Sequence, residues 1–64
     1  MKTNTKKRIF NKGNVSVWNE TTHGNNETAL YLGGARVSVL PGHSNINILK
    51  RAKELSNDNV HYQQ

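Results

Sequence analysis

The chain has 64 residues, carries a formal net charge of +5 and contains no cysteine. A chain of this length forms one small domain and leaves no room for a deep substrate pocket. The absence of cysteine excludes disulfides, thiolate metal sites and a cysteine nucleophile. A basic balance of this size favours a polyanionic partner such as nucleic acid.

The first twelve residues are basic and contain no acid. Residues 1–7 are polar and typical of a disordered arm, so we expect a single domain over residues 8–56. Ile9 and Phe10 are the first side chains able to enter a core. Residues 8–12 are compatible with either a strand or a short helical turn.

The first predicted strand covers residues 14–18, where Val15 and Val17 alternate with polar or amphipathic neighbours. This alternation places Trp18 on the opposite face from the two valines. Residues 19–27 contain no apolar side chain, which predicts an exposed and mobile loop.

Residues 28–32 and 35–40 are predicted to form a hairpin closed by Gly33-Gly34, because two glycines supply the positive φ angles of a type I′ turn. The turn sets the register, in which Leu30 faces Val37, Ala29 faces Ser38 and Tyr31 faces Arg36. One face of the hairpin is then apolar (Leu30, Leu32, Val37, Val39) and the other amphipathic (Ala29, Tyr31, Arg36, Ser38).

A helix is predicted over about residues 45–56, capped by Ser44 or Asn45 after Pro41-Gly42 ends the strand. Its apolar positions follow helical spacing (Ile48, Leu49, Ala52, Leu55). Residues 57–64 are expected to fray. The predicted fold is α+β, a three-stranded antiparallel meander with one amphipathic helix packed on its apolar face.

The predicted function is a non-catalytic, regulatory module that binds RNA or DNA. Base or sugar contacts are expected from Trp18, Tyr31 and Arg36 on the sheet face away from the helix. Phosphate contacts are expected from the basic side chains Lys6, Lys7, Arg8, Lys12, Lys50, Arg51 and Lys53. Two alternatives concern the Trp18 face: it is covered by the N-terminal residues or a second copy of the chain, or it binds a host protein as phage- and plasmid-type inhibitors do.

The histidines His23, His43 and His61 show no metal-ligand spacing, so no metal or cofactor is expected. His23 or His43 could act as a general base, although an ordinary loop histidine is favoured for each. No apolar run approaches a membrane span, which predicts a cytoplasmic protein without membrane contact.

The run from Gly24 to His43, followed by the helix, resembles the HicA-type toxins, small mRNA interferases with a double-stranded-RNA-binding-domain-like fold. The likeness lies in the strand Arg36-Val37-Ser38-Val39, in Pro41 and in His43. It implies an RNA-facing surface and makes a ribonuclease toxin the catalytic alternative. The family's catalytic histidine would fall at Glu27, and its opening helix is poorly matched, so the resemblance favours the fold and the surface over nuclease activity.

Overall fold

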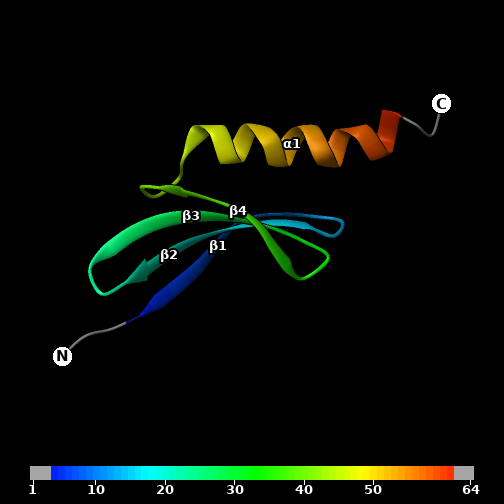
Figure 1. Ribbon diagram of the computed structural model, residues 1–64. Helices are drawn as coiled ribbons and strands as arrows, with labels where there is room; N and C mark the ends of the chain where they lie inside the picture. Colours follow the sequence, from blue (N-terminus) through cyan, green and yellow to red (C-terminus); the bar gives the residue numbers. More distant parts are fainter. Residues whose placement is uncertain (1–3, 62–64) are drawn as a thin grey trace.

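The computed structural model describes the backbone of residues 4–61 and the side chains of residues 4–56. Four antiparallel strands follow one another in a meander of order β1-β2-β3-β4, namely β1 (Thr5–Lys12), β2 (Val15–Thr22), β3 (Asn25–Leu32) and β4 (Ala35–Pro41). The helix α1 (Ile46–His61) then runs along one face of the sheet (Figure 1). The α+β class and the C-terminal helix are confirmed, but the expected three strands are four.

Three two-residue turns, ten residues apart, connect the strands. Gly33 and Gly34 have φ angles of 60° and 89°, the combination that a type I′ turn requires and that the sequence predicts. His23 and Gly24 repeat this combination with φ angles of 51° and 83°. Three turns of equal length join strands of nearly equal length, so the sheet is a regular ribbon of hairpins.

The polar segment 19–27 is a hairpin, and the predicted mobile loop is wrong. Strand β2 continues to Thr22 and β3 begins at Asn25, so both strands are longer than the sequence suggests. The two strands pair throughout this segment, with Asn19 opposite Thr28. Backbone ladder hydrogen bonds do not depend on apolar side chains, and a turn at His23-Gly24 is enough to bring two polar segments together.

Each outer strand contains a β-bulge that reverses which residues face the helix. In β1, Arg8 pairs with Trp18 but Phe10 pairs with Val17, so Ile9 is the extra residue. The bulge places Phe10 on the helix side, although Arg8, two residues earlier, faces away from the helix.

The bulge in β4 corrects the predicted hairpin register. Tyr31 faces Arg36 as predicted, but Ser38 lies opposite Leu30 and Val39 lies opposite Ala29, because Val37 is the extra residue. The predicted pairs of Leu30 with Val37 and of Ala29 with Ser38 are therefore wrong. Val37 is 51% exposed and does not belong to the core.

The core lies between α1 and the central strands. Its buried side chains are Val15, Val17, Leu30, Ile48 and Ala52, with Ile9, Phe10, Leu40, Leu49 and Leu55 packed against them. The predicted apolar stripe of the helix is confirmed as its packing face. On the sheet, Leu40 takes the place of the predicted Val37 and Val39, because Val39 lies opposite Ala29 on the other face. Leu32 lies at the margin with 38% exposure.

Polar side chains of the sheet hold the connection between β4 and α1. The buried hydroxyl of Thr28 donates to the carbonyl of Gly42 and accepts from the backbone N–H of Asn45. Asn45 caps the helix, because its Oδ1 accepts the N–H of Asn47 at 2.9 Å. The side chain of Thr28, in β3, thus fixes the direction in which the helix leaves the sheet.

The ends of the domain differ from those expected. Strand β1 starts at Thr5, so residues 5–7 of the predicted arm belong to the sheet. The helix continues to His61, beyond the predicted end near residue 56. The rest of the predicted arm, residues 1–3, and the end of the predicted tail, residues 62–64, lie outside the described residues.

Candidate nucleic-acid interface

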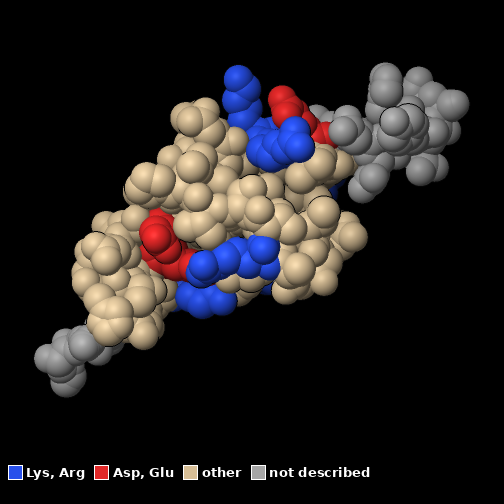
Figure 2. Space-filling model, in the orientation of Figure 1, with Lys and Arg blue, Asp and Glu red and all other residues tan. Residues whose placement is uncertain are grey.

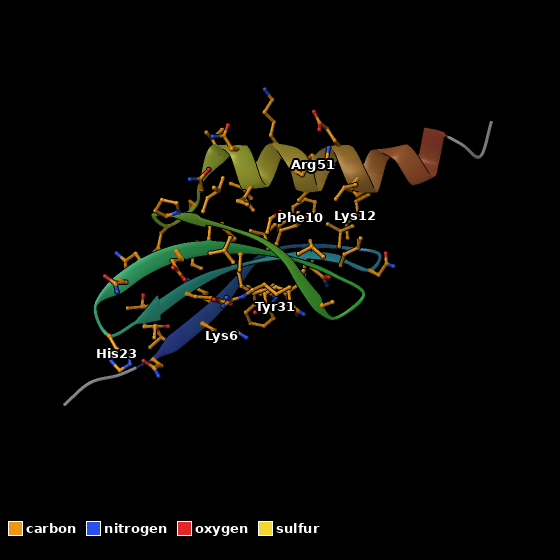
Figure 3. All side chains as sticks on the ribbon, in the orientation of Figure 1. Lys6, Phe10, Lys12, His23, Tyr31 and Arg51 are labelled. Carbon is orange, nitrogen blue, oxygen red and sulfur yellow. The ribbon has the colours of Figure 1, made fainter. Side chains whose placement is uncertain are left out.

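The sheet face turned away from α1, here named the distal face, collects most of the aromatic and charged side chains of the strands. In Figure 3, Lys6 and Tyr31 lie on this side of the sheet, opposite the helix. Strand register assigns further members of the face to the same side, among them Arg8, Asn11, Ser16, Trp18, Glu20, Glu27, Ala29, Arg36 and Val39. The predicted grouping of Trp18, Tyr31 and Arg36 on one face agrees with this register.

Two cations lie over the aromatic rings of the distal face. The Trp18 and Tyr31 ring centroids are 6.4 Å apart, with an angle of 70° between the ring planes. Lys6 Nζ lies 5.2 Å from both centroids, and Arg8 Cζ lies 5.6 Å from that of Trp18. These distances are within the roughly 6 Å reach of a cation–π interaction. The face therefore combines aromatic rings with positive charge.

A buried carboxylate holds this face together. Glu20 is only 4% exposed, and its Oε2 accepts a hydrogen bond of 2.7 Å from the Tyr31 hydroxyl. Arg36 donates to Oε1, while Lys6 Nζ lies 3.9 Å from Oε2 and donates to the Tyr31 oxygen at 3.4 Å. A buried charge is tolerated only with such partners. Glu20 thus fixes the positions of the Tyr31 ring and the Arg36 guanidinium.

The same cluster raises the pKa of the Arg36 guanidinium above its ordinary value, first through hydrogen bonding with the Tyr31 side chain and then through the charge of Glu20. The sequence interpretation missed Glu20, because it placed this residue in a loop. The signal that could have found it is the period of two in β2, which puts Glu20 on the same face as Trp18 once the strand is extended.

Lys7 and Lys12 do not join the distal face. Lys7 pairs with Asn19 and Lys12 with Val15, both on the helix side of the sheet. Figure 3 shows Lys12 on the side of the sheet that α1 covers. Lys6 and Lys7 are neighbours in sequence with side chains on opposite faces, as a strand requires.

The basic residues of α1 form a second, separate surface. Lys50, Arg51 and Lys53 are exposed on the helix, and Arg51 Nη1 lies 3.8 Å from Glu54 Oε1. On the side of the molecule that Figure 2 shows, Lys and Arg side chains form two groups, one over the helix and one over the strands. The basic side chains predicted to contact phosphates therefore lie on separate surfaces, and among the described residues the distal face is the one that combines them with the rings of Trp18 and Tyr31.

Neither candidate general base lies in the distal cluster. His23 is exposed at the tip of the β2–β3 hairpin (Figure 3). His43 Nε2 lies 3.1 Å from the backbone oxygen of Glu20 and 3.1 Å from Thr21 Oγ1, so it ties the β4–α1 connection to β2. Within residues 4–61, the histidine and acidic side chains described do not form a group of three able to hold a metal ion.

Comparison of the chain with models of known protein families, with curated proteins and with solved structures finds no match. The segment that would form the opening helix of a HicA-type toxin forms β1 instead. In the described part of the chain, the helix is neither long nor apolar enough to cross a membrane. Function must therefore be inferred from the distal face itself.

Proposed function

We propose that the chain is a small, non-catalytic module that binds nucleic acid through its distal face. The observation that carries the proposal is the position of Lys6 and Arg8 beside the rings of Trp18 and Tyr31. Cations supply the affinity for phosphates, and aromatic rings supply surfaces for bases. Both are placed on one side of one sheet.

The charge of the chain supports the same partner. The net charge of +5 attracts a polyanion to the whole molecule. On the distal face, three cations (Lys6, Arg8, Arg36) face two carboxylates (Glu20, Glu27). Arg36 pairs closely with Glu20 and Lys6 lies 3.9 Å from it, so Lys6 and Arg8 are the cations that can turn toward a phosphate. Their side chains reach the surface from β1, at one border of the sheet.

A matched pair of double variants tests the proposal. Lys6→Gln with Arg8→Gln removes two charges from the distal face, and Lys7→Gln with Lys12→Gln removes two from the helix side of the same strand. We expect the distal variant to lose most of the affinity for a fluorescent oligonucleotide and the helix-side variant to lose little. The slope of log K against log salt should fall by about 0.7–0.9 for each phosphate that the variant no longer neutralises.

The outcomes of this titration separate the proposal from its rivals. Equal losses in the two variants would mean that the net charge, and not the distal face, decides binding. If the unmodified chain binds no oligonucleotide at low salt, the alternative of a protein partner is favoured, with Trp18 and Tyr31 as its anchors.

The toxin alternative is tested by incubating purified chain with an mRNA. We expect no cleavage, because the two candidate bases lie on the hairpin tip and in the β4–α1 connection. Cleavage that His23→Ala or His43→Ala abolishes, while binding is retained, would replace the proposal with a ribonuclease.

A further inference from the structure

We infer that the distal face binds unpaired nucleotides, so that its ligand is a single-stranded nucleic acid; the inference rests on the proposed function. The evidence is the order of chemical groups across the sheet. The aromatic rings come from the central strands β2 and β3, through Trp18 and Tyr31. The cations come from the outer strands, Lys6 and Arg8 from β1 and Arg36 from β4.

This order is the reverse of what the surface of a duplex offers. A duplex presents its phosphates outward and keeps its bases stacked and paired inside, so its backbone would meet the aromatic centre of the face. In that centre Glu20 is buried and bound to Arg36 and Tyr31, so the Arg36 guanidinium is already engaged and offers a duplex phosphate little. An unpaired strand can place its bases over β2 and β3 and its phosphates at the border of the sheet.

The geometry of the two rings favours a flexible ligand. With an angle of 70° between them, the Trp18 and Tyr31 rings cannot both stack on neighbouring bases that are parallel, as the bases of a duplex are. A single strand can turn between the two rings. The Tyr31 ring is held in place by its hydroxyl, which donates to Glu20 at 2.7 Å.

The cations over the rings are able to move aside. The Lys6 side chain is 53% exposed and has a long, flexible stem. When a phosphate attracts Lys6 or Arg8, the cation leaves the ring, and the base of the same nucleotide can take its place. Binding then exchanges an internal cation–π interaction for a stacked base and an ion pair.

The outer surface of α1 is the competing site, and it fits a base less well. Its basic residues Lys50, Arg51 and Lys53 have no aromatic neighbour among the described helix residues, and Arg51 is paired with Glu54. The affinity of a duplex that bound there through its phosphates would not change on substitution of Trp18.

The test uses the unmodified chain and four probes of equal length, about 12 nucleotides, within the range that single-strand-binding sites cover. The probes are oligothymidylate, oligouridylate, an abasic strand with the same phosphates, and a duplex. Trp18 is the only tryptophan, so its fluorescence reports stacking directly. We expect the two single strands to bind about tenfold or more tighter than the abasic strand and to quench Trp18. The tighter of the two identifies DNA or RNA.

Two variants of Trp18 isolate the contribution of the ring. Trp18→Leu should weaken single-strand binding by about fivefold to a hundredfold and abasic binding much less, whereas Trp18→Phe should retain most of the affinity. Thermal unfolding followed by circular dichroism identifies a variant that fails to fold. The comparison of the intact strands with the abasic strand uses the unmodified chain and does not depend on any variant.

The failures of the two proposals are distinguishable. Equal binding of the intact and the abasic strand, or tighter binding of the duplex, would overturn the inference of unpaired nucleotides and leave nucleic-acid binding in place. Absence of binding to all four probes at low salt would overturn the proposed function itself.

Discussion

The two faces of the sheet are built from the same strands but differ in chemistry. On the face that α1 covers, β2 and β3 contribute Val15, Val17 and Leu30 to an apolar core. On the distal face, the residues between them include a buried carboxylate, Glu20, bound to a tyrosine and an arginine. Because side chains alternate along a strand, one backbone can present an apolar core on one face and a cluster of aromatic and charged side chains on the other.

The covered face should account for the largest loss of stability. Leu30 is 2% exposed and lies in the centre of the core, so Leu30→Ala should lower the free energy of unfolding by about 2–5 kcal/mol. A core of this size supplies only about 3–5 kcal/mol, so most of the chain should be unfolded at 37 °C. Urea or thermal unfolding followed by circular dichroism measures the change.

Leu32→Ala is the matched control, since Leu32 is on the same strand and the same face but 38% exposed. Its effect should be clearly smaller than that of Leu30→Ala. Equal effects would show that the core does not centre on Leu30.

The distal face should contribute a smaller amount through Glu20. Glu20→Gln retains the shape but removes the charge that Arg36 and Tyr31 bind, and should cost about 1–2 kcal/mol. The loss is limited because the side chain of Arg36 is half exposed and returns to water. Binding should weaken as well, because Tyr31 and Arg36 lose their fixed positions.

Glu27→Gln serves as the control, because Glu27 lies opposite Glu20 on the same face and gives the same change in net charge. Simple electrostatics predicts tighter binding of a polyanion by both variants. Tighter binding by Glu20→Gln would show that Glu20 acts only as a negative charge and does not position its neighbours.

The smallest effect is expected at the start of the helix. Asn45→Ala removes the cap of α1 and should cost about 1 kcal/mol, while nucleic-acid affinity stays unchanged because the helix is on the covered face. Asn47→Ala, two residues later and inside the helix, should be neutral or stabilising. A loss of affinity in Asn45→Ala would mean that the two faces are coupled.

Much of the fold follows from local patterns in the sequence. Alternation predicts part of β2, two glycines predict the Gly33-Gly34 turn, and helical spacing predicts the packing face of α1 through Ile48 and Ala52. What these segments share is a regular period. Each can therefore be assigned from its own residues.

The remainder depends on interactions that no single segment reveals. The bulges at Ile9 and Val37 break the period of two, and they are favoured because each brings a later apolar residue, Phe10 or Leu40, to the helix side. The polar strand around Glu20 lacks an apolar pattern and is defined by its partner strand. Alternation is enough to place Trp18, Tyr31 and Arg36 on one face, whereas Glu20 joins them only once the strand is extended beyond its apolar part.

The bulges have a further consequence for the behaviour of many copies of this chain in one solution. An outer strand exposes unpaired backbone groups that can template another strand and let sheets grow from molecule to molecule. Here the ladder of β1 is interrupted at Ile9, and the same strand carries Lys6 and Lys7. The ladder of β4 is interrupted at Val37, and that strand ends at Pro41. The same irregularities that direct side chains to their faces thus oppose aggregation into fibrils.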